Sequence, residues 1–348
     1  MIITCDANFY RELVSELPLY NIKKVDKVIK LLIDAEKAKG VRAMIGSIAA
    51  QEILSHLVDA PKSRAYKACL KASRVLYKHC EENAMQFRLL PSPEVQFSME
   101  YFQFTNQRAI DTLQTIGAIF SELAKDTSKN TINKYAVQLD QTKQFIKDAE
   151  ATLINEVVNL CKTIDPNYTN WNLFANNQSM RTKWLNFVRS QSFKDRTAEA
   201  FLTAVYMRIH PQGCRIYTQA QIKQMIPAFV SSCQAGLSLR QFFWEQFINE
   251  GFDLTTKSRA NFLWDEQILY YVGRQIGNED IVLVTRDKQM RAAADRCGFS
   301  NSVMSYEEYL GFLGIADEIA KLKKNWLRDL IRKLKCAIKT LFKKNRKG

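Results

Sequence analysis

Apolar and polar residues alternate in two different ways along this chain of 348 residues. Towards both ends, short apolar runs are separated by stretches in which apolar residues recur every three or four positions. Over residues 1–57 this pattern predicts strand, helix, helix, strand and helix. Residues 258–313 return to the same alternation, which is typical of a parallel sheet with helices on both faces. We therefore expect an α/β fold with three layers.

The second of these stretches contains the clearest strand of the chain. A helix is predicted over residues 258–277, ended by Gly277, and the run from Ile281 to Val284 has the continuous apolar character of a buried parallel strand. A helix that ends at Gly298, a short strand and a last helix follow.

Between the two ends, the chain changes character. Residues 58–257 show almost no strand pattern and read as many amphipathic helices, which we interpret as a helical insertion of about 200 residues. The predicted organisation is a discontinuous α/β domain (residues 1–57 plus 258–315), a helical insertion (58–257) and a basic amphipathic C-terminal helix (316–348).

Charge is concentrated in that last segment. The whole chain carries a formal net charge of +14, and residues 321–347 contain twelve Lys and Arg against Asp329 alone, which gives +11 there and +3 for the rest. A basic helix with an apolar stripe can bind a nucleic-acid backbone, an anionic membrane surface or an acidic partner groove, or it can pack on the body with its charges solvated. The basicity of the tail therefore says little about the body.

Cysteine and histidine usage argues against a zinc site. The eight Cys form no C-x-x-C pair and the chain has three His, of which His79 adjoins Cys80 on what we expect to be an ordinary helix surface. We find no basic N-terminal leader and no run of about 18 apolar residues, so we expect no transmembrane segment and a reducing, cytoplasmic location.

Four acidic residues occupy notable positions. Asp6 ends the first predicted strand, and Asp287 follows the Ile281–Val284 strand. Glu52 and Asp265 lie inside predicted helices, Asp265 within an apolar and aromatic flank. Taken singly, the first two can be helix N-caps, Glu52 can be solvated, and Asp265 can pair with Lys or Arg.

Their combination suggests a different chemistry. Residues just past the carboxyl ends of parallel strands converge on one edge of the sheet, and Glu52 and Asp265 reach that edge if their helices begin above it. Several carboxylates buried together repel one another unless a cation neutralises them. Ligands that are all oxygen favour Mg²⁺ or Mn²⁺.

The same residues resemble the motifs of PIN-domain nucleases. "IITCDANFY" looks like the first motif, a strand followed by D-x-N that contains Asp6 and Asn8. "SIAAQEILSHL" is similar to the second and contains Glu52, and "RANFLWDEQILYYVGRQIG" resembles the third and contains Asp265. "IVLVTRDKQMRAAADRCGF" is similar to the fourth, with T-x-D at Thr285 and Asp287. The resemblance covers about a third of the chain, and the helical insertion separates its second and third motifs.

The resemblance implies a three-layer PIN-like (Rossmann-like) domain that hydrolyses phosphodiester bonds, usually of RNA. Mg²⁺ or Mn²⁺ held by Asp6, Asp265, Asp287 and Glu52 would activate a water. Asn8 and Thr285 could orient a ligand, while Arg286 and Lys288 could hold phosphate or simply be solvated. By analogy with the family, we also expect a toxin-like or defence role, with a regulatory protein or antitoxin as partner.

Two alternatives stay open. A phosphatase of the haloacid dehalogenase type also ends its first strand on Asp, but it needs a second Asp two residues later, where this chain has Asn8. A PIN-like domain without activity could serve as a nucleic-acid or membrane adaptor, although all four acids are present.

Overall fold

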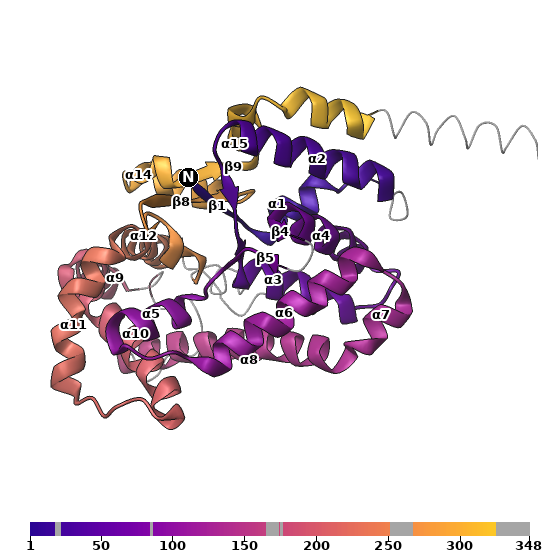
Figure 1. Cartoon of the computed structure of the whole chain (residues 1–348). Helices are drawn as coiled ribbons and strands as arrows, with labels where there is room; N and C mark the ends of the chain where they lie inside the picture. Colours follow the sequence, from indigo (N-terminus) through magenta and orange to yellow (C-terminus); the bar gives the residue numbers. More distant parts are fainter. Residues whose placement is uncertain (18–21, 84–85, 165–173, 175–176, 251–266, 325–348) are drawn as a thin grey trace, which may run out of the picture.

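A central sheet of five short strands organises the chain (Figure 1). The computed structural model describes residues 1–17, 22–83, 86–164, 174, 177–250 and 267–324. The strands run in the order β2-β1-β8-β7, with β9 also paired to β8, and every pair is parallel except β7 with β8. Their bounds are Ile2–Cys5 (β1), Arg42–Ala43 (β2), Gln275–Ile276 (β7), Glu279–Thr285 (β8) and Val303–Ser305 (β9). The predicted parallel sheet is confirmed.

Side chains of the two central strands are buried on both faces of the sheet. Ile3 and Val282 belong to one hydrophobic cluster, and their neighbours Ile2 and Ile281 belong to a second one. Successive strand residues point to opposite faces, so this division follows from the strand geometry. A sheet covered on both faces explains why the run of apolar residues is unbroken.

Helices from distant parts of the chain cover these two faces. The first face packs against α1 (Ala7–Leu13), α2 (Ile22–Ala38), α4 (Arg64–Cys80) and α15 (Tyr306–Leu313). The second packs against α14 (Lys288–Arg296) and against α12 (Gln234–Glu250), which belongs to the predicted insertion. The expected α/β architecture, with a large helical region, is therefore present.

The middle of the chain is mainly helical, as predicted. Two aromatic-rich clusters hold its helices together, one around Phe97 and Phe229 and the other around Trp184 and Trp244. The remaining helices are α3 (Ser47–Ser55), α5 (Pro93–Phe102), α6 (Gln107–Lys125), α7 (Lys129–Lys134), α8 (Ala136–Ile164), α9 (Gln178–Arg189), α10 (Gln191–Ile209) and α11 (Gln219–Ser232). Short 3-10 turns occur at His56–Val58 (η1), His210–Gln212 (η2), Ile268–Tyr271 (η3) and Ser300–Ser302 (η4).

Three very short strands escaped the sequence pattern. Within the predicted helical region, β6 (Leu89–Leu90) pairs in parallel with β3 (Ile45–Gly46), which precedes that region, and β4 (Glu81–Asn83) pairs antiparallel with β5 (Gln86–Phe87). Strands of two or three residues are too short to display alternation, so the expectation that residues 58–257 are almost free of strands was incomplete.

The predicted helix over residues 258–277 is wrong in its last part. Residues 258–266 lie outside the described part of the chain, and η3 ends at Tyr271. Gly273 (φ +71°) then turns the backbone, and Gly277 (φ +60°) opens the two-residue turn that joins β7 to β8. A tight hairpin of this kind requires a left-handed residue, which is what the glycine provides.

One hydrophobic cluster spans the predicted domain boundary at residue 57. It contains residues of β1, α2, α4, α6 and α15, and the N-terminal amine pairs with Glu279 on β8. The division into domain and insertion stays a prediction, because packing runs through that boundary without a break. Residues 316–324 are helical, and the rest of the predicted basic helix lies outside the described residues.

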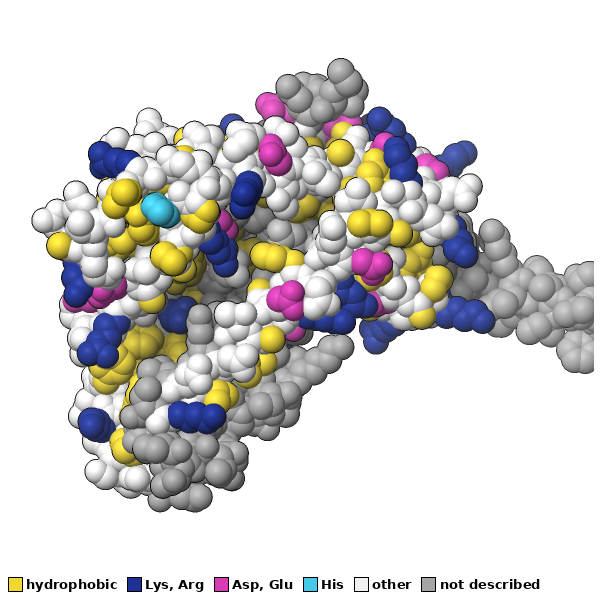
Figure 2. Space-filling view, turned by 90° about the horizontal axis from the view of Figure 1, so that it is seen from below, with side chains coloured by type: hydrophobic (Ala, Val, Ile, Leu, Met, Phe, Trp, Pro, Cys, Tyr) yellow, Lys and Arg dark blue, Asp and Glu magenta, His cyan; other side chains and the backbone are white. Residues whose placement is uncertain are grey.

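The face of the body shown in Figure 2 bears charges of both signs. On the face shown in Figure 2, Lys and Arg side chains are dispersed among hydrophobic and acidic ones and do not gather in one patch. Over the described residues, no helix has the length and apolarity needed to cross a membrane.

Candidate active site

Two of the predicted acids meet at the carboxyl edge of the sheet. Strands β1 and β8 pair in parallel, with Cys5 opposite Val284, and the Asp6 amide donates to the Val284 carbonyl oxygen at 3.1 Å. Asp6, the residue after β1, therefore lies beside Thr285, the last residue of β8. Asp287 follows Thr285 by two positions.

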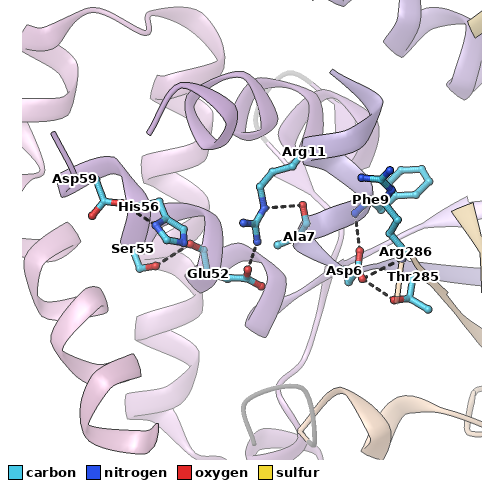
Figure 3. Close-up of polar contacts among 10 residues, drawn as sticks. All are labelled: Asp6, Ala7, Phe9, Arg11, Glu52, Ser55, His56, Asp59, Thr285 and Arg286. Carbon is cyan, nitrogen blue, oxygen red and sulfur yellow. Dashed lines mark hydrogen bonds and ion pairs between the residues drawn. The ribbon is translucent and has the colours of Figure 1, made fainter. Parts of the chain in front are cut away.

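The Asp6 carboxylate is buried and held at both oxygens (Figure 3). Its Oδ1 accepts the Phe9 amide at 2.6 Å, so Asp6 is the N-cap of α1. Its Oδ2 accepts the Thr285 hydroxyl at 2.6 Å and the Arg286 amide at 3.3 Å. Burial raises the pKa of Asp6 above its ordinary value, and these hydrogen bonds oppose the rise only in part.

Thr285 connects Asp6 to Asp287. Thr285 is 2 % exposed. Its hydroxyl donates a hydrogen bond to the Asp6 carboxylate and accepts one from the Asp287 amide at 2.9 Å. Asp287 is in turn the N-cap of α14, with Oδ1 accepting the amides of Gln289 at 2.7 Å and Met290 at 3.3 Å. Its Oδ2 has no partner among the described residues. One hydroxyl thus links the Asp6 carboxylate to the backbone of Asp287.

Glu52 has a different partner from the one the sequence suggested. It lies on α3 and accepts a hydrogen bond from Arg11 Nη2 on α1, with both side chains about a quarter exposed or less. Helix α3 begins close to β1 because Gly46 has no side chain: a Cβ there would lie 3.0 Å from Thr4 Oγ1. Arg11 Nε also donates to the Ala7 carbonyl at 3.3 Å.

A short polar row continues beyond Glu52 (Figure 3). The Ser55 hydroxyl donates to the Glu52 carbonyl at 2.8 Å, and His56 Nδ1 lies 2.8 Å from Asp59 Oδ2. Lys143 donates to the other Asp59 oxygen at 2.6 Å. Burial alone would raise the pKa of Asp59, but the hydrogen bonds from Lys143 and His56 hold it below its ordinary value.

Among the other predicted site residues, the structure describes Asn8, Arg286 and Lys288. Asn8 and Lys288 are exposed, and Arg286 forms an ion pair with Glu12 at 2.6 Å, so its guanidinium points along α1. Asp265 lies outside the described residues, and within them no three His, Cys, Asp or Glu side chains are grouped as a metal site. The structure therefore joins Asp6, Thr285 and Asp287, and it places Glu52 with Arg11.

Arg11 is the site residue that sequence reasoning missed. It is the basic residue in the last turn of α1, and a cation five residues after a predicted ligand, on the same helix, was the available signal. Its charge also lowers the pKa of Asp6, though less than burial raises it.

Comparisons with models of protein families, with curated proteins and with solved structures returned no match. The chemistry of the site has to be argued from its own donor atoms.

Those donor atoms suit a hard divalent cation. A carboxylate has about four lone-pair positions; Asp6 uses three of them, and Asp287 leaves Oδ2 entirely available. Mg²⁺ is commonly held by one or two carboxylates, together with waters and substrate phosphate oxygens. Asp6 and Asp287, aligned by Thr285, fit that pattern.

Proposed function

We propose that this protein is a metal-dependent endonuclease, with RNA as the preferred substrate. The observation that carries the proposal is the hydroxyl of Thr285, which ties together the acids that end two adjacent parallel strands. Asp6 and Asp287 would hold Mg²⁺ or Mn²⁺, with Asp265 as the predicted third ligand. The ion would supply a water of lowered pKa and neutralise charge on the scissile phosphate.

The protein's own part in this reaction is positioning. Asp6 cannot rotate, because three hydrogen bonds from three residues fix both of its oxygens. Asp287 is fixed through one oxygen, and its other oxygen has no partner among the described residues. Preorganised ligands of this kind lose little entropy when the cation and the substrate bind.

The proposed RNA substrate agrees with the charge distribution. The body is nearly neutral, so most of the attraction for a polyanion would come from the basic tail, residues 321–347. A toxin-like or defence role under the control of a regulatory protein is part of the same proposal and rests on the resemblance of the motifs.

A cleavage assay with matched variants tests this proposal. Purified protein is incubated with labelled RNA and, separately, with labelled DNA, each with Mn²⁺ or with EDTA. We expect metal-dependent cleavage that Asp6→Asn and Asp287→Asn abolish, while Asp111→Asn on the exposed face of α6 keeps it. Absence of metal-dependent cleavage of either polymer would overturn the proposal. Binding without turnover would favour the adaptor alternative.

Thr285 offers a finer test, because two variants separate its hydroxyl from its shape. Thr285→Val removes both hydrogen bonds at nearly constant volume, whereas Thr285→Ser keeps the hydroxyl. We expect the Val variant to lose roughly 10–100-fold in activity, as is typical for a group that orients a metal ligand, and the Ser variant to stay near wild type. Equal activities of the two variants would contradict the role given to the hydroxyl.

A further inference from the structure

We infer that Arg11 binds a phosphate group of the nucleic acid, and that Glu52 positions Arg11 and is not a metal ligand. This inference rests on the proposed nuclease function and reassigns one of its four predicted acids. It starts from the ion pair between these two residues, which come from different helices, α1 and α3.

The orientation of Arg11 follows from helix geometry. Side chains on an α-helix lean towards its N-terminus, and Arg11 Nε donates to the carbonyl of Ala7, four residues earlier. Helix α1 begins at the carboxyl edge of the sheet, where Asp6 caps it. The guanidinium is therefore carried back towards the end of the helix that Asp6 caps, and Figure 3 shows it between Asp6 and Glu52.

The hydrogen bonds of Arg11 leave room for a ligand. A guanidinium has five N–H donors in a planar fork, and the described residues engage two of them, through Nε and Nη2. Its side chain is 21 % exposed, so it can contact a bound polymer while most of its surface stays packed against the protein. Planar, bidentate donation to phosphate oxygens is the recognition for which Arg is well suited.

Charge balance decides between the two roles of Glu52. With one divalent cation, Asp6 and Asp287 are neutral together, Asp265 would add one negative charge, and Arg11 with Glu52 is neutral by itself. If Glu52 became a ligand, the cation site would gain negative charge and Arg11 would lose its partner. A phosphodiester that arrives with one negative charge finds in Arg11 an already oriented cation beside the acids.

The test separates metal binding from phosphate binding. Mn²⁺ binding is measured by calorimetry, and binding of a single-stranded RNA by fluorescence anisotropy with Ca²⁺ in place of Mn²⁺ and also with EDTA. The variants are Glu52→Gln, Arg11→Ala, Arg11→Lys and, as the reference for lost metal binding, Asp6→Asn.

We expect Glu52→Gln to bind Mn²⁺ within about twofold of wild type, and Arg11→Ala to bind RNA about tenfold more weakly, the usual loss for a hydrogen bond to a charged group. Loss of one phosphate contact should also reduce the salt dependence of RNA binding by about 0.7 in log–log slope. Arg11→Lys keeps the charge without the fork, so an intermediate affinity is expected.

Two results would overturn the inference: loss of Mn²⁺ binding in Glu52→Gln as complete as in Asp6→Asn, or unchanged RNA affinity in Arg11→Ala. If the single variants unfold, the double variant Arg11→Gln/Glu52→Gln, which keeps a hydrogen bond between neutral groups, must show the same weaker RNA binding with intact Mn²⁺ binding. Wild-type protein that binds RNA through Arg11 but cleaves nothing would refute the proposed function and leave this site standing.

Discussion

A buried ion pair beneath the candidate site makes the stability of the fold depend on pH. His79 Nε2 on α4 lies 2.7 Å from Glu36 Oε1 on α2, and the two side chains are 0 % and 5 % exposed. Tyr309 donates to the same carboxylate oxygen at 2.5 Å, and Tyr10 lies 3.1 Å from His79 Nδ1. Burial alone would lower the pKa of His79, but the Glu36 carboxylate outweighs it and raises the pKa to about 10.

The sign and size of the effect follow from linkage. Because the folded-state pKa of His79 lies above the unfolded value of about 6.5, the pair stabilises the fold fully below pH 6.5, and this contribution is lost as pH rises towards 10. Between these values the folded state holds one proton more than the unfolded state. The free energy of unfolding then falls by up to about 1.4 kcal/mol per pH unit, which over that window reaches a ceiling of roughly 5 kcal/mol.

Chemical unfolding measured from pH 7 to pH 10 tests this. The matched variant is Glu36→Gln/His79→Gln, which keeps polar groups of similar size but removes both charges. Burial raises the pKa of cysteines such as Cys69 to about 11, so that these thiols ionise in this range mainly in the unfolded chain. They are present in both proteins, and the difference between the two slopes therefore reports the pair. The exposed pair Lys134–Glu122 serves as a control whose removal should leave the slope unchanged. If the free energy of unfolding of wild type and double variant fell in parallel with pH, His79 and Glu36 would not form a charged pair in the folded state.

Three further predictions concern packing and the tail. Lys323→Ala should lower the free energy of unfolding by about 1–3 kcal/mol, because the buried ammonium donates to the Glu12 carbonyl at 2.8 Å; urea denaturation checks it. Gly236→Ala should lower the free energy of unfolding by about 1–3 kcal/mol in the same assay, since the added Cβ would lie 2.5 Å from a carbonyl oxygen of η3. Its control is Gly311→Ala, which adds a Cβ in open space and should leave the free energy of unfolding unchanged or raise it. Deletion of residues 325–348 should weaken RNA binding and flatten its salt dependence, and unchanged binding would exclude the tail from the interface.

The elements that the sequence predicted well are those with a long repeating pattern. The Ile281–Val284 run is buried on both faces and is flanked by polar residues, so strand β8 stood out, as did the acids that follow β1 and β8. Strand β6, with two residues, carries no such pattern. Its place depends on pairing with the distant strand β3, which periodicity cannot report.

The charged contacts were harder to predict for a related reason. His79 was expected on an ordinary helix surface, yet it is 1 % exposed, because α4 packs against α1 and α2 and meets a carboxylate 43 residues earlier in the chain. The pairing of Arg11 with Glu52 likewise joins two helices 41 residues apart. A single chain contains many Lys, Arg, Asp and Glu residues, and only the packing of helices determines which of them meet.

The geometry of Asp6 and Asp287 changes how such acids should be interpreted in a sequence. Helix capping and metal ligation look like competing explanations for each, but a cap uses only part of a carboxylate. Asp6 caps α1 through Oδ1, and Asp287 caps α14 through Oδ1 with Oδ2 left available. Capping sets the direction of each carboxylate, and Thr285 bonds both the Asp6 carboxylate and the Asp287 amide. An acid that caps a helix at the carboxyl edge of a parallel sheet is therefore better prepared to hold a cation, because the fold has already fixed its orientation.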